Sequence, residues 1–569
     1  MVVLTNLLFE DPTLVKSYLA VFRILAPLLS VVLLWRCCKP LLTFRREPEI
    51  WGFLCIKDGK KLPITHWESI IGRHPKSDLV VDFPTISRNH AVLTRYDDGS
   101  WTITDSGSKD GVRVNDEKIN ISPITSEDII NIGGVEMNLQ TVSKEQEERL
   151  TEMRTKASSG MDSIATVLLL SVFQALTCLG FLLGGNQDDV FSICAGFGGI
   201  MAAQWLLLML YFLIRRPAFE VETAAFFLCT LGMAAICTVH PEEAVKQLIA
   251  LLMGMTLFLV VGSTMRNLEL TKSMRYVAAV IGILLLVVTL VFGREYYGAK
   301  NWLMLGPLSI QPSELSKVCF VFVGASTMDR LVNKRNLILF IGYTLLICGC
   351  LALMNDFGTA LIFFFAFLMI AFLRSGSVGT IGLALTALGF AGVLALKIAP
   401  HALRRFSVWR HVWESPFDAG YQQTRSMMCI ASGGMFGLGL GKGWLKHLFA
   451  ADSDVVFATI AEEWGLVMAV LPVLVIVILT LFAMRCSHVS RSSFYAIGAC
   501  TAGSILIVQT IFNVLGTVDV VPLTGVTFPF VSNGGSSMIC AWGLLAFIKA
   551  ADTRQNASFA VRLGESRRK

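Results

Sequence analysis

Apolar runs of about 20 residues recur from Ser17 almost to the C-terminus, and no other feature constrains the fold as strongly. A helix of that length crosses the hydrocarbon core of a bilayer and satisfies its own backbone hydrogen bonds there. The chain is 54% hydrophobic and only 16% charged, which excludes an ordinary soluble protein. The sequence therefore predicts a polytopic α-helical membrane protein with about thirteen spans. They are expected at residues 17–36, 163–184, 190–213, 220–240, 243–264, 273–292, 313–329, 336–354, 357–373, 377–397, 455–483, 493–515 and 536–550.

One polar segment, residues 50–142, interrupts this pattern completely. Short β-rich runs such as Leu79–Phe83 and His90–Thr94 alternate there with Gly, Asp, Asn and Pro. Short strands bounded by turn residues are typical of an all-β sandwich. The charged residues 143–161 that follow are expected to form a helical linker.

The distribution of Lys and Arg predicts how the chain is oriented. Arg36 and Lys39 follow the first span, whereas Glu10 and Asp11 precede it. Because cytoplasmic loops are enriched in Lys and Arg, we expect the N-terminus outside and both the β domain and the C-terminus in the cytoplasm. The alternation of spans then places four charged side chains at the outer face: Glu314, Lys317, Asp356 and Asp454.

The outer loop 398–453 breaks this charge rule, because it carries Arg404, Arg405 and further cations. Cations kept outside suggest an anionic ligand such as a lipid-linked phosphate, although a long outer loop also tolerates charge. The loop ends at Asp454, at the mouth of an apolar run. An ionisable group there is energetically costly, so Asp454 is a functional candidate and a possible general base.

Four blocks of the polar segment carry a family resemblance: Gly72–Asp78, Ile86–His90, Ser108–Gly111 and Val114–Asn115. In this order and spacing they resemble the forkhead-associated (FHA) domain, whose loops bind phosphothreonine peptides. Within these blocks His90 is expected to be a core histidine.

The FHA resemblance implies a phosphopeptide site at Arg73, Ser87, Arg88 and Asp110. A guanidinium and a hydroxyl offer hydrogen-bond donors to a phosphate, which fits the first three positions. Asp110 departs from the family, which usually has Asn there, and a carboxylate weakens or redirects phosphate binding. The expected partner is a phosphothreonine-containing protein; the alternative is a scaffold that has lost phosphate binding.

Five blocks near the outer face carry a second resemblance: Gly298–Trp302, Gln311–Lys317, Asn355–Thr359, Tyr421–Asp454 and Asn513–Ser537. They resemble the SEDS family (shape, elongation, division and sporulation) of FtsW, RodA and SpoVE proteins. The resemblance covers residues 220–550 and implies a ten-span core. The expected organisation is an anchor at 1–49, the FHA domain at 50–142, a linker at 143–161, two extra spans at 162–219, the SEDS core at 220–550 and a basic tail at 551–569.

The SEDS resemblance implies a peptidoglycan glycosyltransferase of the bacterial cytoplasmic membrane that polymerises lipid II with a class B penicillin-binding protein. Asp454 matches the family's essential acid, and we expect it to be the general base, with a pKa raised by partial burial. Glu314 and Lys317, three residues apart on one helix face, and Asp356 match other functional positions. Substrate-binding residues are expected at Arg404, Arg405, Gln422, Ser432, Gly433, Gly434 and Ser536. A divalent cation, Mg²⁺ or Mn²⁺, is expected from the pyrophosphate chemistry, although no metal-binding motif is visible.

Several positions depart from the SEDS pattern. Asp452 and Ser453 stand where the family usually has His-Thr, Asn301 where it has Arg, and Arg425 where it has Gln. These changes concern substrate positioning rather than the class of protein. Two alternative functions remain open: a lipid II flippase and a phospho-dependent cell-wall scaffold. Nothing in the basic residues suggests nucleic acid binding.

Overall fold

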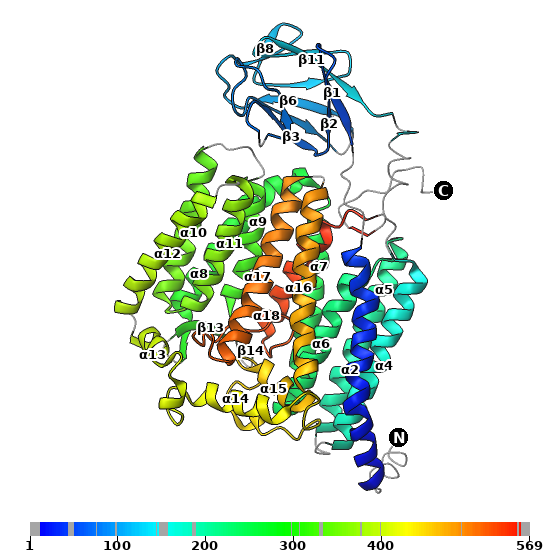
Figure 1. The fold of residues 1–569 in the computed structure, drawn as a ribbon, viewed down its shortest axis with the longest axis vertical. Coiled ribbons are helices and arrows are strands. Elements are labelled where there is room, and N and C mark those ends of the chain that lie inside the picture. The colour runs from blue at the N-terminus through cyan, green and yellow to red at the C-terminus, as the bar shows by residue number, and fades with distance from the viewer. Residues whose placement is uncertain are drawn as a thin grey trace.

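A small β domain stands at one end of a larger helical body in the structure, a computed structural model (Figure 1). The structure describes residues 12–43, 50–75, 77–96, 99–143, 145–146, 158–184, 189–296, 299–305, 308–328, 334–375, 378–398, 400–490, 492–554 and 557–558. The acidic N-terminal residues Glu10 and Asp11, most of the predicted linker and most of the basic tail lie outside these ranges.

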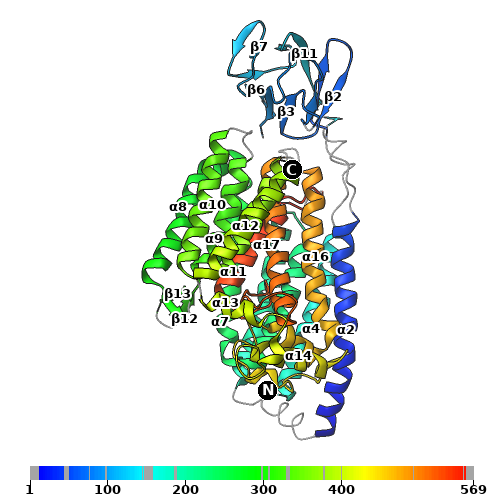
Figure 2. The ribbon, with the colours of Figure 1, turned by 60° about the vertical axis from the view of Figure 1, so that its left-hand side comes forward.

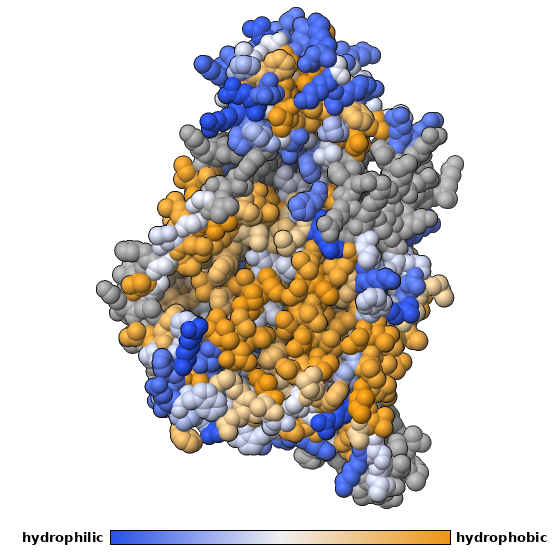
Figure 3. Space-filling model, viewed as in Figure 1, coloured by the Kyte–Doolittle hydropathy of each residue, from blue (hydrophilic) through white to orange (hydrophobic). Residues whose placement is uncertain are grey.

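One helix occupies each of the predicted spans except residues 455–483, which are divided between two helices. The bounds are α2 (Pro12–Leu42), α4 (Gly160–Gly184), α5 (Val190–Leu213), α6 (Glu220–Val239), α7 (Ala244–Thr264), α8 (Leu268–Phe292), α9 (Pro312–Met328), α10 (Lys334–Leu353), α11 (Phe357–Ser375), α12 (Val378–Ile398), α16 (Leu466–Val489), α17 (Ser493–Thr517) and α18 (Gly535–Ala550). Within the described residues, nine helices are long and apolar enough to cross a membrane, and two shorter apolar helices join them. Figure 3 shows a broad apolar surface across the helical body, as a membrane-embedded protein requires.

The predicted span 455–483 is not one helix, and this part of the prediction was wrong. The chain forms a short helix, α15 (Val456–Trp464), and then α16, with Gly465 between them. Gly465 has φ 87°, and a Cβ there would lie 2.3 Å from the carbonyl oxygen of Met435. Only glycine tolerates both conditions, so the backbone turns at this residue.

Two sheets form the β domain, in the strand orders β2-β1-β11-β10-β7-β8 and β4-β3-β5-β6-β9. The bounds are β1 (Gly52–Ile56), β2 (Lys61–Ile64), β3 (Glu68–Gly72), β4 (Leu79–Val80), β5 (Ala91–Arg95), β6 (Trp101–Asp105), β7 (Val112–Val114), β8 (Glu117–Ile119), β9 (Ile121–Ile124), β10 (Ile129–Ile132) and β11 (Val135–Thr141). Burial alternates along strands such as β1, so every second side chain, for example Leu54, enters a common core with Leu93 and Ile130. This is the predicted sandwich.

Helix α6 lies at the centre of the helical body, with almost every residue buried. The additional helices α2, α4 and α5 pack on one side of it, and Figure 2 shows α2 running beside α16. Gln174 of α4 and Gln204 of α5 exchange amide hydrogen bonds of 3.1 and 2.9 Å, and Gln174 also donates to Thr230 of α6. Because buried polar groups must be paired in an apolar body, this network fixes how the additional helices sit on the core.

Short elements close the end of the helical body that lies away from the β domain (Figures 1 and 2). They are the strands β12 (Arg294–Tyr296), β13 (Ala299–Leu305) and β14 (Leu308–Ile310), which form one sheet, and the helices α13 (Pro400–Val408), α14 (Tyr421–Gly433) and α15. They bring together motifs that are far apart in the sequence.

Candidate active site

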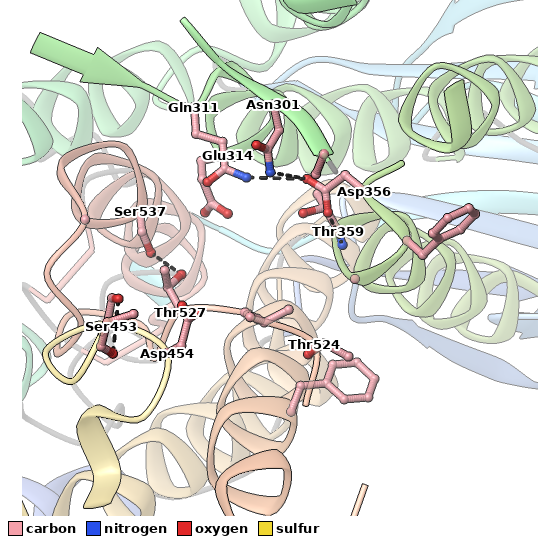
Figure 4. Close-up of a pocket in the computed structure, with 18 of the residues that line it drawn as sticks. Asn301, Gln311, Glu314, Asp356, Thr359, Ser453, Asp454, Thr524, Thr527 and Ser537 are labelled. Atoms are coloured by element: carbon pink, nitrogen blue, oxygen red, sulfur yellow. Dashed lines mark hydrogen bonds between the residues drawn. The ribbon is translucent and has the colours of Figure 1, made fainter. Parts of the chain in front are cut away.

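A cavity of about 600 Å³ lies among these short elements (Figure 4). Its wall comes from β13 and β14, the first turns of α9, α11 and α18, residues of α13 and α17, the segment before α15 and the segment between α17 and α18. Its described polar lining is Asn301, Ser309, Gln311, Glu314, Asn355, Asp356, Thr359, Arg405, Ser453, Asp454, Thr524, Thr527, Asn533, Ser536 and Ser537. Helix starts and loops, rather than helix centres, therefore supply the chemistry.

Asp454 lies in the wall of this cavity, just before α15. Its backbone is held on both sides, because its N–H donates to the carbonyl of Ala450 at 3.1 Å and its carbonyl accepts from Asn513 Nδ2 at 3.0 Å. Among the described residues, none donates a hydrogen bond to its carboxylate. Burial raises the pKa of Asp454 to about 6; the positive charge of Arg405 opposes this rise. A fixed backbone, a free carboxylate and a raised pKa are what a general base requires.

Gly525 faces the Asp454 carboxylate from the opposite segment. It has φ 71°, and a Cβ there would lie 3.4 Å from Oδ2 of Asp454. Glycine at this position therefore permits a left-handed turn and leaves room beside the carboxylate.

Asp452 has a different environment from Asp454. Its Oδ2 atom accepts a hydrogen bond of 2.8 Å from Asn533 Nδ2, and its carbonyl accepts one of 2.7 Å from the Asn533 N–H. Burial raises the pKa of Asp452, and the hydrogen bond from Asn533 opposes that rise. Asp452 thus fastens the segment between α17 and α18 to the loop before α15, and among the described residues it is not part of the cavity lining.

Glu314 and Lys317 form the ion pair that their spacing predicted, with 2.6 Å between Oε1 and Nζ. Lys317 is fully buried behind Glu314, and only Glu314 is among the described lining residues. The second carboxylate oxygen of Glu314 has no hydrogen-bond partner within the described part of the chain. Lys317 therefore holds Glu314 in place, and the unpaired oxygen of Glu314 is buried next to the cavity.

Asp356 is the N-cap of helix α11. Its Oδ1 atom accepts from the N–H of Thr359 at 3.1 Å, and Oδ2 accepts from Asn301 Nδ2 at 3.3 Å and Gln311 Nε2 at 3.4 Å (Figure 4). An N-cap carboxylate stabilises a helix start on its own. Here the two amides also orient it toward the cavity.

Arg405 is the one Lys or Arg among the described residues that line the cavity, and its Nη1 atom donates to the carbonyl of Thr524 at 3.0 Å. The predicted neighbour Arg404 lies on α13, but its side chain is outside the described part. The described residues contain no group of three or more His, Cys, Asp or Glu side chains that would hold a metal ion. The divalent cation stays a prediction.

The other predicted substrate-binding residues divide into two groups. Ser536 lies in the cavity wall, where its Oγ accepts from the N–H of Gln311 at 2.9 Å. Gln422 of α14 instead donates to the carbonyl of Phe449 at 3.1 Å, and Ser432 donates to the carbonyl of Cys429 within α14. Gly433 packs against the backbone of Glu462. Gly434 accepts a hydrogen bond from the N–H of Leu466. These four are not among the described lining residues, and their role in substrate binding stays a prediction.

The adjacent carboxylates of Glu462 and Glu463 hold the loop that joins α14 to α15. Glu462 accepts hydrogen bonds of 2.9 Å from the N–H groups of Trp444 and Leu445, and Glu463 accepts from Gly443 at 3.1 Å. They therefore tie the loop to α15.

The predicted phosphopeptide residues lie on neighbouring loops at one end of the β domain. Arg73, Arg88 and Asp110 are exposed and Ser87 is half-buried. The N–H of Arg73 donates to the carbonyl of Ser87, and the Oγ of Ser87 accepts from the N–H of Lys109 at 3.2 Å. These bonds join the three loops into one surface. On this surface the exposed Arg73 donates from Nη1 to the carbonyl of Pro84 at 3.3 Å, and Arg88 is also exposed.

His90 has the structural role that was predicted. It is fully buried, its Nδ1 accepts from the N–H of Ser87 at 3.0 Å, and its Nε2 lies 3.1 Å from the carbonyl of Gly111. Through these two contacts His90 connects the loop at Ser87 to the loop at Gly111.

Comparison with known proteins identifies both parts of the chain. Residues 236–557, more than half of the chain, match the family described as cell cycle protein, FtsW/RodA/SpoVE. The chain belongs to the FtsW/RodA/SpoVE family. Residues 69–133 match the FHA domain. The predicted SEDS recognition, the fold class and the glycosyltransferase class are thereby confirmed.

Named relatives agree with this family. A probable peptidoglycan glycosyltransferase FtsW of Buchnera aphidicola is 32% identical, over 46% of this chain and 68% of its own length. The peptidoglycan glycosyltransferase RodA of Mycobacterium tuberculosis is 29% identical, over 54% of this chain and 70% of its own. A solved structure described as "structural coordination of polymerization and crosslinking by a peptidoglycan synthase complex" contains a chain 25% identical to this one, with a TM-score of 0.50 and coverage of 58% and 96%.

Several residues that line the cavity were not among the predicted site residues. Gln311 and Asn301 orient Asp356, and Thr527 shares a hydrogen bond of 2.7 Å with Ser537. All lie in the outer motif blocks. The signal was therefore present in the sequence, but only the fold shows which of their side chains face inward.

Proposed function

We propose that the chain polymerises peptidoglycan glycan strands from lipid II on the outer face of the bacterial cytoplasmic membrane. The observation that carries this proposal is the free Asp454 carboxylate, which lies in the same cavity as Glu314, Asp356 and Arg405. Names of relatives in the family support the reaction class.

The lining of the cavity fits a lipid-linked sugar. Polar groups gather around Asp356 and Asp454, whereas Leu361 and Ile362 of α11 and Phe512 of α17 supply apolar surface. Pockets for such ligands combine apolar walls with a few placed polar groups. In this proposal the sugar and pyrophosphate bind in the polar part of the cavity, and the first isoprene units contact its apolar part.

The proposed reaction is a single displacement. The 4-hydroxyl of an acceptor N-acetylglucosamine attacks the anomeric carbon of the growing chain while Asp454 takes its proton. The bond between that carbon and the pyrophosphate oxygen breaks, undecaprenyl pyrophosphate leaves, and the configuration inverts. In this proposal Arg405 stabilises charge on the leaving oxygen. The support is that Arg405 is the one Lys or Arg among the described lining residues.

A reconstitution experiment separates this enzyme from a flippase. The full chain, with and without a class B penicillin-binding protein, is placed in vesicles with lipid II, and both glycan polymer and transbilayer movement of lipid II are measured. Polymer formed by the wild type and not by Asp454→Ala supports the proposal. Lipid II movement without polymer would support a transporter instead.

We further propose that the β domain lies in the cytoplasm and recruits the synthase to a phosphothreonine-containing protein. Arg73, Ser87 and Arg88 supply hydrogen-bond donors on one surface, which suits a phosphate. Asp110 shares the end of the domain with them and limits affinity by repulsion. The predicted alternation of spans supports this location, because the β domain stands at the end of the helical body opposite the cavity (Figure 1).

A further inference from the structure

A second cavity, of about 270 Å³, lies at the end of the helical body that faces the β domain. It forms where the C-terminal end of α2 meets the N-terminal ends of α4 and α6. The match to the FtsW/RodA/SpoVE family begins at residue 236, so all three contributing segments precede it. Helices α2 and α4 are additional to the core expected at residues 220–550, whereas α6 lies within it, so the cavity forms where the additional helices meet that core.

The rim of this cavity carries two cations and one aromatic ring. Arg36 lies 3.9 Å from Asp162, with both side chains substantially exposed, so the pair is loose. Lys39 lies 5.6 Å above the ring of Trp35 and has no carboxylate partner among the described residues. Tryptophan, lysine and arginine gather at membrane surfaces, and both cations bind phosphate.

The floor of the cavity has the opposite hydrogen-bonding character. The hydroxyls of Ser163, Thr166 and Thr223 line it, and each donates its hydrogen to a backbone carbonyl at 2.6 or 2.7 Å. Their oxygens keep lone pairs as acceptors. Glu220 also lines the floor, where its carboxylate accepts hydrogen bonds from Arg554 at 3.2 and 3.3 Å and from the N–H of Ser158 at 3.2 Å. The rim thus donates and the floor accepts.

We propose that this cavity binds a phospholipid headgroup that carries hydrogen-bond donors. Its phosphate binds Arg36 and Lys39, and its ethanolamine ammonium or glycerol hydroxyls point to the hydroxyl-lined floor. A choline headgroup has no hydrogen to donate and does not satisfy the floor. The acyl chains lie along the exposed apolar face of α2 at Leu28, Val31 and Val32.

Native mass spectrometry of the full detergent-solubilised chain tests this assignment. Phosphatidylethanolamine, phosphatidylglycerol and phosphatidylcholine with identical acyl chains are titrated separately, and retained lipid is counted. The test variant is Arg36→Gln with Lys39→Gln. The control is Arg275→Gln, because Arg275 stacks on Tyr276 on α8 and is not among the described lining residues of this cavity. Circular dichroism checks that helix content is unchanged.

We expect the wild type and the Arg275→Gln control to retain one ethanolamine or glycerol lipid in preference to choline lipid. Two lost charge-assisted contacts should weaken that binding at least about tenfold in the double variant. Equal retention of all three lipids, or equal binding by the double variant, would overturn the proposal. Displacement by equimolar soluble glycerophosphoethanolamine would also overturn it and identify a free phosphodiester as the ligand.

Discussion

Asn301 Nδ2 donates a hydrogen bond to Oδ2 of Asp356 at 3.3 Å, so that strand β13 orients the carboxylate that begins helix α11. In the pattern that the resemblance implies, this position is Arg. In this chain the neutral amide of Asn301 donates to Asp356 instead, and Gln311 contributes a second amide hydrogen bond to the same oxygen. The cavity thereby holds one cation fewer than the family pattern implies.

Asn301→Ala should slow lipid II polymerisation about 3- to 10-fold without abolishing it, since one neutral hydrogen bond is lost and Gln311 remains. Asn301→Arg should retain activity, because the guanidinium restores a donor to Asp356. Steady-state polymer formation measures both. A full wild-type rate for Asn301→Ala would show that the amide does not position the acid.

The rate of polymerisation should fall as the pH falls below about 6. Burial raises the pKa of Asp454 to about 6, and a general base acts only when it is ionised. Below that pH the ionised fraction, and with it the rate, drops about tenfold per unit. Initial rates from pH 5 to 8 measure this, with thermal unfolding at each pH as the control. A flat profile down to pH 5 would contradict the assignment.

Lys317→Met should destabilise the protein strongly, by about 3–5 kcal/mol, because it leaves the buried Glu314 carboxylate without its partner. Adding Glu314→Gln should recover most of that stability, since no charge is then left unpaired. Activity should not recover, because the cavity lining then lacks the negative charge of Glu314. Thermal unfolding and polymer formation on the same samples separate the two effects. Recovery of full activity in the double variant would make the pair purely structural.

The FHA surface gives opposite predictions for two of its residues. Arg73→Ala in the full chain should abolish binding of a phosphothreonine peptide, since an exposed guanidinium is removed from the phosphate site. Asp110→Asn should strengthen binding, because it removes a negative charge near the phosphate. Fluorescence anisotropy with phosphorylated and unphosphorylated peptides measures both. If the wild type binds neither peptide, the domain is a scaffold that has lost phosphate recognition.

The sequence pattern predicted the general architecture but not the local geometry. Apolar runs and the alternation of spans placed Glu314, Asp356 and Asp454 at one end, because length and charge bias decide that without packing. The break at Gly465 was missed, because it depends on the close approach of Met435, which sequence periodicity does not encode. The resemblance predicted a substrate-binding role for Gln422, which stays a prediction. Its hydrogen bond to the carbonyl of Phe449 could not be foreseen, since tertiary packing decides where α14 points.

Glycan polymerisation by Asp454→Asn, compared with Asp452→Asn, tests the central claim most directly. Both variants remove one carboxylate charge from the same loop and preserve the shape of the side chain. Asp454 faces the cavity without a hydrogen-bond donor among the described residues, whereas Asp452 is held by Asn533. Asp454→Asn should make no detectable polymer from lipid II, and Asp452→Asn should keep measurable activity. Equal polymer from Asp454→Asn and the wild type would contradict the account.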